Sequence, residues 1–463
     1  MTGKKPAAGA GGRRLVSAPV RGAIRALLPF VNWNRIYGTL SYLRSALWVV
    51  PIIAVALAIV SIKLLTLLDQ WIPWDLTILE VDGARALFQT VITLTLSFMV
   101  FTFGSLLVAI QIAGGQLTPR IIATTLLRDK VIKYTVGLHV FTMLLAITAL
   151  NRMTGSVFEL VTVTVALLGI ASLASFLFLI DYSARLLRPV RIVALVCDEG
   201  MEVVRGVYGE AFDPSQHADE ADVDSGQLGP PARTVTHDGR SQVVLAADLA
   251  SLVAEARRCD GVVEVLPQVG DFIAADEPLL HLYGGAAQCE DAVLKEAIAL
   301  GTERTMEQDP MFAFRILVDV ALKALSPAIN DPTTAVLAMD QIHRLLRFVG
   351  KRQLHGQGVR DDAGELRVVF RTPDWDNFVD IAFTEIRACG GNSVQIVRRM
   401  RAMLENLLRS LPATRHAALH RQLDLLERTL PGLYPLEEDL ALARIPDSQG
   451  LGGASGGSPG ASR

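Results

Sequence analysis

The chain has 463 residues, more than one ordinary domain needs, and it is 51% hydrophobic but only 20% charged. The small net charge of −3, without a strongly basic domain, argues against a nucleic-acid partner. The four cysteines (Cys197, Cys259, Cys289 and Cys389) lie far apart, which favours free thiols in a reducing compartment over a disulfide framework or a zinc site.

A basic arm opens the chain over residues 1–40. It contains lysines and arginines but no aspartate or glutamate. Positive charge directly before an apolar segment is typical of the cytoplasmic side of a membrane, so we expect this arm to be cytoplasmic.

Four apolar stretches follow within residues 41–190, at 45–68, 86–119, 131–150 and 157–180. A helix needs about 20 apolar residues to cross a bilayer core of about 30 Å, and each stretch is long enough. The first is too long for a signal peptide and three more follow it, so we expect it to be retained. The sequence therefore predicts a four-helix transmembrane domain embedded in the lipid bilayer.

The charges between these stretches predict the orientation. The connection after the first stretch is acidic, whereas the connection after the second and the segment after the fourth are basic. Basic flanks stay in the cytoplasm. We therefore expect a multi-pass protein of the bacterial plasma (inner) membrane with both termini cytoplasmic.

The second stretch is polar but uncharged. With His139 of the third stretch, the candidate residues for lining a pore or cavity are Thr95, Thr102, Ser105, Gln111, Gln116 and His139. Hydroxyl and small residues also serve plain helix packing and hydrogen bonding between helices. An ionisable residue inside a membrane suggests a functional site, but His139 also suits a neutral, hydrogen-bonded interior position. Both interpretations are carried forward.

Residues 191–285 contain β-branched runs between turn residues, which predicts a small β-rich module. The segment GDFIAADEPLLHL resembles the barrel-sandwich repeat of biotinyl and lipoyl carrier domains, in which a Gly-Asp turn follows a strand. Asp276 stands where that repeat usually has glycine, and aspartate tolerates a left-handed backbone better than most residues. No lysine is available to carry a prosthetic group, so we expect no cofactor.

Residues 286–440 show helical spacing of apolar residues, and the Gly- and Ser-rich residues 441–463 predict a disordered tail. Within the helical part, residues 367–370 are expected to form an isolated strand. His416 and His420 have the spacing of a metal pair but lack a third ligand, so we expect no metal there. The expected fold class is membrane α-helical with four transmembrane helices, plus a cytoplasmic α+β region with a small β module and a helical C-terminal part.

The stretch SPAINDPTT interrupts two helical segments at residues 326–334. Pro327 disfavours continuation of the first helix, and Asp331 before Pro332 has the pattern of an N-cap and first helical residue. Capping does not require four further polar residues: Ser326, Asn330, Thr333 and Thr334. A helix N-terminus ringed by such groups could also bind an anion or a partner's backbone, so a corner alone and a corner with a binding role both stay open.

Four stretches together resemble a bacterial integral-membrane family known as domain of unknown function 2254. They read FTFGSLLVAIQIAGGQLTPRII, GDFIAADEPLLHL, GTERTMEQDPMFAFRILVDVALKALSPAINDPTTA and FVDIAFTEIRACG. The resemblance implies a four-span membrane protein with a cytoplasmic C-terminal region, and it brings no activity. The residues that match the family's motifs are Gln116, Pro119, Arg120, Arg304, Asp309, Asp319, Ser326, Pro327, Asn330, Asp331, Pro332 and Thr334.

These features support two functional hypotheses. The first is an oligomeric channel or transporter-like protein for an ion or small ligand, with a cytoplasmic gating or assembly domain; four helices make a thin wall, so we expect a homo-oligomer. The second is a non-transporting scaffold or sensor that binds a ligand or protein at the corner, with Arg304 and Asp309 as further candidates. We expect no enzyme, because no acid has a nucleophile or base at a suitable spacing.

Overall fold

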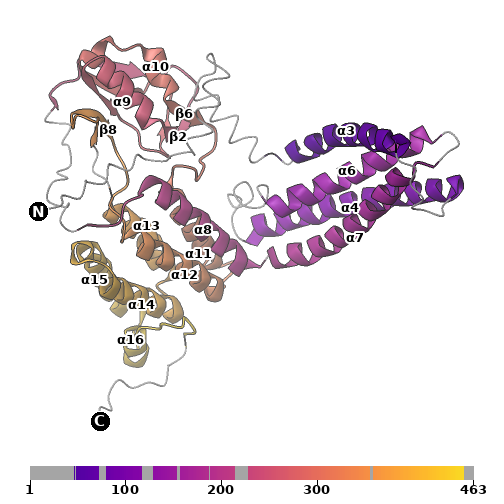
Figure 1. The fold of residues 1–463 in the computed structure, drawn as a ribbon. Coiled ribbons are helices and arrows are strands. Elements are labelled where there is room, and N and C mark those ends of the chain that lie inside the picture. The colour runs from indigo at the N-terminus through magenta and orange to yellow at the C-terminus, as the bar shows by residue number, and fades with distance from the viewer. Residues whose placement is uncertain are drawn as a thin grey trace, which may run out of the picture. The chain divides into compact units, whose positions relative to one another are not determined.

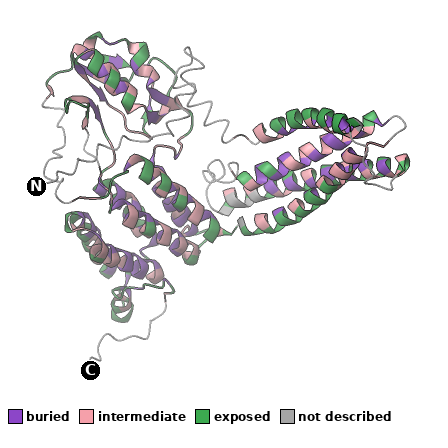
Figure 2. Ribbon diagram, viewed as in Figure 1, coloured by how far each residue is buried: buried purple, intermediate pink, exposed green. Residues whose placement is uncertain are grey.

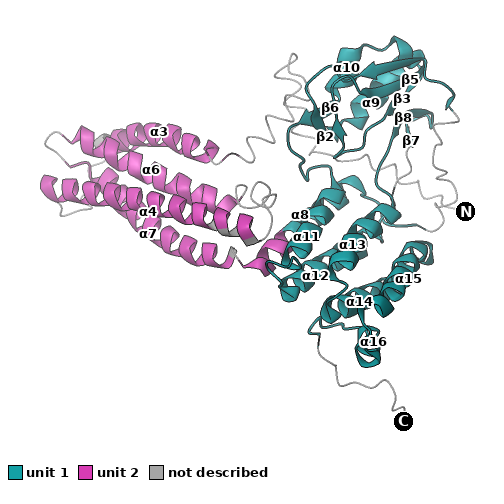
Figure 3. Cartoon of the chain, turned by 180° about the vertical axis from the view of Figure 1, so that it is seen from behind, with its two compact units in different colours: residues 1–39, 196–463 teal, residues 40–195 magenta. Residues whose placement is uncertain are grey.

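The computed structural model describes most of the chain. The described residues are 46, 48–71, 80–116, 129–153, 157–186, 188–213, 228–354 and 358–452. The basic arm 1–40, Pro119, Arg120 and residues 453–463 lie outside them. The chain forms two compact units, a membrane unit of residues 40–195 and an extramembrane unit that holds residues 196–463 (Figure 3).

The membrane unit consists of long apolar helices. They are α3 (Val49–Trp71), α4 (Val81–Gln116), α6 (Lys130–Arg152) and α7 (Glu159–Leu186) (Figure 1). All four are long and apolar enough to cross a membrane, which confirms the predicted spans. A helix satisfies its own backbone hydrogen bonds, and hydrocarbon offers no alternative partner.

Helix α6 is the central element of this unit and packs against α3, α4 and α7. Its residues are largely buried, whereas the outer faces of α3 and α7 are exposed (Figure 2). Glycines permit close approach: a Cβ on Gly137 would lie 2.6 Å from Val50 Cγ1, and one on Gly169 would lie 2.9 Å from Val91 Cγ2. The exposed outer faces carry large apolar side chains, which suits contact with lipid.

Carboxylates join the ends of these helices. Asp129 is the N-cap of α6, and its side chain accepts hydrogen bonds from Val131 N at 2.8 Å and from the Tyr182 hydroxyl of α7 at 2.5 Å. At the end of α3, Asp69 accepts a hydrogen bond from Leu160 N at 2.9 Å. These contacts satisfy the free N–H groups at the starts of α6 and α7.

After residue 190 the structure differs from the predicted strands. Helix α8 (Pro189–Val207) covers this region. Its β-branched residues fall at helical spacing, so Val193, Val196 and Val204 are all buried on one face. The helical period of burial, together with contacts to distant helices, outweighed the strand preference of valine.

Two sheets build the β module of the extramembrane unit. The five-stranded sheet has the order β1 (Arg233–Thr236), β5 (Pro278–Gly284), β3 (Gly261–Val265), β8 (Leu366–Phe370) and β7 (Gly358–Arg360). The three-stranded sheet has the order β4 (Phe272–Ile273), β2 (Gln242–Ala247) and β6 (Ile298–Gly301). Helices α9 (Leu249–Arg258), η4 (Gly285–Gln288) and α10 (Asp291–Glu296) complete the module, and side chains from both sheets share one apolar core. Asp276 adopts the left-handed backbone, with φ 66°, that was expected of it.

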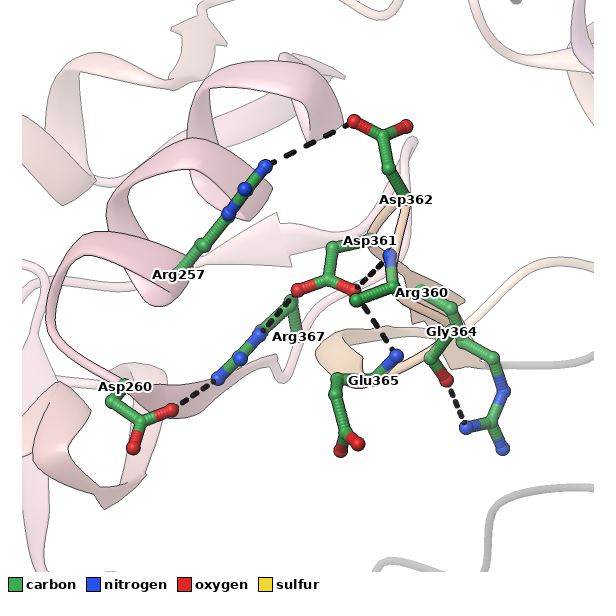
Figure 4. A network of polar contacts seen from close by, with 9 residues as sticks. Arg257, Asp260, Arg360, Asp361, Asp362, Gly364, Glu365 and Arg367 are labelled. Carbon is green, nitrogen blue, oxygen red and sulfur yellow. Dashed lines mark hydrogen bonds and ion pairs between the residues drawn. The ribbon is translucent and has the colours of Figure 1, made fainter.

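Strand β8 is not the isolated strand that the sequence predicted. It pairs in parallel with β3 and antiparallel with β7. A polar network fixes this distant hairpin on the end of α9 (Figure 4). Asp361 accepts hydrogen bonds from Glu365 N at 3.0 Å and Arg367 Nε at 2.9 Å, and Arg367 also donates to Asp260 at 3.0 Å. Pairing with a strand about 100 residues away is invisible to local spacing.

The rest of the extramembrane unit is helical. Its helices are α11 (Pro310–Ala324), α12 (Pro332–Val349), α13 (Trp375–Gly390), α14 (Val394–Ser410), η5 (Ala413–Arg415), α15 (His416–Leu433) and α16 (Glu437–Ala443). Asp309, Asp331 and Asp374 are the N-caps of α11, α12 and α13, and each accepts a backbone N–H through its side chain. The predicted membrane-helical and α+β fold class is thus confirmed.

The predicted disordered tail, residues 441–463, begins too early in the chain, because α16 extends to Ala443 and residues 444–452 make defined hydrogen bonds. Residues 444–452 are held by Arg398, which is fully buried and donates to Ile445 O and Gly452 O, both at 2.9 Å. Asp447 accepts from Gly450 N and Gly452 N. A buried arginine recruits carbonyl partners because an unpaired charge in the interior is costly, and this orders a Gly-rich segment.

Candidate functional site

The half-buried Arg304 and the buried Asp309 form a joint in the extramembrane unit. Asp309 is 1% exposed, caps Phe312 N at 3.0 Å, and forms an ion pair with Arg304. The Arg304 guanidinium also lies 5.4 Å from the ring centre of Phe312. Close by, Gln308 Oε1 accepts a hydrogen bond from Ala247 N of β2 at 3.1 Å. These residues connect the β module to the start of α11.

Gly270 completes the joint. Its φ is +96°, and its N–H donates to Val244 O at 2.8 Å, which holds the Gly-Asp turn against β2. A Cβ at this position would lie 2.5 Å from both Asp309 Oδ2 and Arg304 Cζ. Only glycine therefore allows the turn to rest on the ion pair.

The pKa of the Asp309 carboxyl is raised above its ordinary value by burial, and the hydrogen bond and charge of Arg304 act in the opposite direction. A protonated or unpaired carboxyl would weaken the joint. The geometry thus gives Arg304 and Asp309 a structural role, which the motif resemblance alone did not indicate.

The corner at residues 326–334 lies at the other end of α11. A helix of 15 residues is about 22 Å long, so the structure does not unite Arg304 and Asp309 with the corner in one site. The sequence-based grouping of all seven candidates combined two places that a helix separates.

At the corner, Asp331 caps α12 as predicted. It accepts hydrogen bonds from Thr334 N at 3.0 Å and from the Thr334 hydroxyl, while Ser326 Oγ donates to Lys323 O at 2.7 Å. Asn330 is exposed, with a left-handed φ of 48°, and Ile329 beside it is 41% exposed. Thr333 is exposed as well. The cap engages Asp331 and Thr334 internally and leaves Ile329, Asn330 and Thr333 facing outward.

The predicted lining residues of the membrane unit divide between two faces. Thr95 and Thr102 are buried on the side of α4 that carries Phe98, whose ring centre lies 5.7 Å from that of His139. Ser105 is half-buried and Gln111 is exposed. Gln116 ends α4, and its side chain lies outside the described residues. These residues do not share one surface.

His139 belongs to a buried polar cluster between α6 and α7. Its Nε2 lies 3.2 Å from both Ser172 O and Ser175 Oγ, and Ser172 Oγ donates to Thr142 Oγ1 at 3.2 Å. The cluster hydrogen-bonds two helices across the bundle interior. Its geometry suits the interior interpretation of His139, with a ring fixed by neighbouring hydroxyl and carbonyl groups.

The sequence analysis did not separate the exposed face of α4 from its buried face. The exposed polar and small residues Gln89, Thr93, Ser97, Gly104 and Gln111, which we name the α4 stripe, share one arc with the exposed apolar residues Val100 and Leu107. Their spacings of four and seven residues keep them within an arc of roughly 80° on a helix. A helical plot would have found the arc, but only packing shows that it faces away from the other described helices.

The sequence analysis also did not predict that Cys259 and Cys289 lie close together. All four described cysteines are free thiols. Yet Cys259 and Cys289, separated by 30 positions, come together with Glu255, and their ligand atoms all lie within 4.8 Å of one another. The spacing of Glu255 and Cys259 by one helical turn was the available signal, and Cys289 joins them only through the fold.

Four membrane-crossing helices followed by a separate α+β unit define a multi-pass integral membrane protein. The chain belongs to the family described as predicted membrane protein (DUF2254), whose model matches residues 44–406. It is 27% identical over 442 residues to an uncharacterized protein of Mycobacterium bovis and, equally, to one of Mycobacterium tuberculosis H37Rv. Each alignment covers 88% of this chain and 81% of the relative. No solved structure matches the chain.

The Gly270 geometry generates a stability prediction. Gly270→Ala should lower the free energy of unfolding by roughly 2–4 kcal/mol, because its positive φ costs about 1 kcal/mol and the new Cβ also pushes the partly exposed Arg304 away from the buried Asp309. Gly364→Ala is the matched control: its φ is +83° but nothing lies within 4 Å of the added Cβ, so it should cost only about 1 kcal/mol. Denaturant unfolding of both variants measures the difference, and equal losses would contradict the joint.

The raised pKa of Asp309 generates a pH prediction. Arg304→Met removes the group that opposes the effect of burial, so the folded-state pKa of Asp309 should rise further above the unfolded value of about 3.9. Stability is then lost as pH rises through the folded-state pKa, because the unfolded chain has already released the proton. The drop in Tm caused by Arg304→Met should therefore be larger at about pH 7 than at about pH 4, near the unfolded-state pKa.

The control for this experiment is the double variant Arg304→Met/Asp309→Asn. Asparagine retains the N-cap but does not titrate. The Tm difference between the double variant and the parent protein should therefore lack the pH dependence that titration of Asp309 adds in Arg304→Met. An Arg304→Met deficit that is constant over the same pH range would show that Asp309 does not titrate there.

Proposed function

We propose that the protein is an oligomeric, channel- or transporter-like membrane protein whose subunits meet along the α4 stripe and border a shared path for an ion or small ligand. The observation that carries this proposal is the row of exposed polar and small residues on α4, which runs beside the exposed Val100 and Leu107 and which none of the other described helices of the chain covers. The extramembrane unit then serves assembly or gating, and no enzymatic activity is proposed.

The glycine at position 104 supports the inference that another helix packs against the α4 stripe. Glycine inside a helix costs about 1 kcal/mol relative to alanine. Gly137 and Gly169 have contacts in their own chain that account for them, but nothing lies within 4 Å of a Cβ on Gly104. A second helix approaching the stripe would use the space that Gly104 leaves.

The stripe's hydroxyls bond within the helix, so the polar group that calls for a neighbour is the amide of Gln89. The hydroxyls of Thr93 and Ser97 donate to the carbonyls four residues earlier, at 2.9 and 2.8 Å. Gln89 lies within the candidate span and is exposed, so its side-chain amide would face lipid in a monomer. Transfer of an amide into hydrocarbon without a partner costs roughly 4–8 kcal/mol. Contact with another subunit or with a water-filled path removes this cost.

A single copy is too small to enclose a path. The other three spanning helices pack around α6, and the interior is filled by residues such as Phe88, Leu145 and Val165. A path bordered by the α4 stripe therefore requires several copies. The buried His139 cluster, in this proposal, stabilises each subunit's bundle.

Filling the stripe should impair both assembly and flux. Ser97→Leu or Gly104→Leu should reduce ion flux into proteoliposomes by at least about tenfold, because bulk replaces the close contact. Ala174→Leu, which adds bulk to an exposed position of α7, is the matched control and should retain flux.

The same positions test contact between copies. In a cysteine-free background, Ser97→Cys should form cross-linked dimers in membranes on mild oxidation, and Ala174→Cys should not. Absence of flux across several ions, with no Ser97→Cys cross-link, would refute the proposal. A cross-link without flux would retain the oligomer but exclude the channel.

We also propose that the protein lies in the bacterial plasma membrane with both termini in the cytoplasm. The basic arm and the basic flanks support this orientation. Cys389 is exposed in the extramembrane unit, whereas Trp71, at the end of α3, is 80% exposed and lies on the opposite side in this topology. A membrane-impermeant thiol reagent should label Cys389 only after permeabilisation, and should label Trp71→Cys, in a Cys389→Ser background, in intact cells. The reverse pattern would invert the topology.

A scaffold or sensor is the second candidate function. The observation that favours it is the pair Ile329 and Asn330, which project an apolar and an amide group from the corner. Ile329→Ser with Asn330→Gly should abolish capture of a partner by the purified protein, since glycine keeps the left-handed backbone but removes the amide. The Tm should be unchanged, and undisturbed capture of the same partner would exclude this site.

A further inference from the structure

Three potential metal ligands meet at one edge of the β module. Glu255 and Cys259 occupy the last turn of α9 and its C-cap, and Cys289 follows η4. One Glu255 carboxylate oxygen and the two Sγ atoms all lie within 4.8 Å of one another. Cys289 is 2% exposed, and Cys259 is half-buried.

We propose that Glu255, Cys259 and Cys289 bind a thiophilic divalent cation such as Zn²⁺. Thiolates and a carboxylate oxygen are ligands that Zn²⁺ accepts, and one water completes a tetrahedral shell. With Zn–S distances of about 2.3 Å, the two sulfurs of such a shell lie about 3.8 Å apart. Side-chain rotation alone can close the remaining gap of at most about 1 Å.

The backbone holds the two cysteines near each other. Strands β3 and β5 pair Gly261 with Gly284, and the segments just beyond this pair touch directly. A Cβ on Gly285 would overlap Cys259 O, and one on Gly261 would overlap Ala286 N. Glycine at both positions brings the segment that carries Cys259 against the segment that leads to Cys289.

The polar network of Figure 4 also holds the end of α9. Asp260, next to Cys259, has φ +52° and accepts a hydrogen bond from Arg367. Arg367 is itself held by Asp361 of the β7–β8 hairpin. The backbone of Cys289 is anchored as well, because its carbonyl oxygen accepts a hydrogen bond from the Arg233 guanidinium at 2.5 Å. Both cysteines therefore lie on anchored backbone, as a pre-organised site requires.

Charge balance also suits a dication. Two thiolates and a carboxylate carry three negative charges, which leaves one after a divalent cation binds. Arg258 donates to both oxygens of Glu255, at 2.9 and 2.6 Å, and supplies the compensating positive charge. Such an outer partner orients the ligand and commonly contributes about 10–100-fold in metal affinity.

The experiment uses the full-length protein in detergent, reduced and stripped of metal. Cd²⁺ serves as a spectroscopic probe, because thiolate ligands give an ultraviolet charge-transfer band, and Zn²⁺ retention is measured after dialysis. We expect one equivalent per chain, loss of the band in Cys259→Ser and in Cys289→Ser, and at least about tenfold weaker binding in Glu255→Gln and Arg258→Gln. Cys389→Ser is the control and should bind like the parent protein.

Three outcomes would overturn the proposal. The first is equal binding by the parent protein and the Cys259→Ser/Cys289→Ser double variant. The second is no stoichiometric Cd²⁺ or Zn²⁺ binding by the reduced protein. The third is loss of binding only in variants whose metal-free Tm has also fallen, which would indicate misfolding. A metal-dependent rise in Tm that is absent in serine variants of normal metal-free Tm would support the site.

Discussion

Hydrocarbon offers no hydrogen bonds, and the architecture of the membrane unit follows from this constraint. Its backbone is helical, the starts of α6 and α7 are capped by the carboxylates of Asp129 and Asp69, and its interior histidine is held by hydroxyl and carbonyl groups. One part of the membrane unit departs from this constraint, and the departure points to a neighbouring molecule. The α4 stripe places polar and small residues on an outer face, and the cost of that arrangement is the physical reason to infer a neighbour.

The extramembrane unit depends on buried charge instead. Asp309 and Arg304 lie where the Gly-Asp turn rests on the start of α11, and Arg398 orders the C-terminal residues up to 452. Arg304 pairs with Asp309 five residues later, whereas Arg398 donates to carbonyl groups about 50 residues away. Buried charges of this kind add little stability, but removal of one partner is costly, so they specify how the segments fit together.

The family motif residues thus divide by physical role. Arg304, Asp309 and Asp331 are engaged in ion pairing and capping, while Asn330 is exposed. Asp319 pairs with Arg315 on the flank of α11. The motif spans both ends of α11, and several of its residues serve folding rather than binding. The exposed residue Asn330 is where a partner can make contact.

The sequence by itself determined the features that depend on neighbours along the chain. Apolar length specified four spans, Asp-Pro specified the start of α12, and the tolerance of aspartate for a left-handed backbone was met at Asp276. Only the tertiary structure decided that α8 is a helix, that β8 pairs with β3, that α4 has an outward polar face, and that Cys259 meets Cys289. These are contacts across tens to about a hundred residues. Local spacing constrains each segment's own conformation but carries no information on which distant segment will cover it.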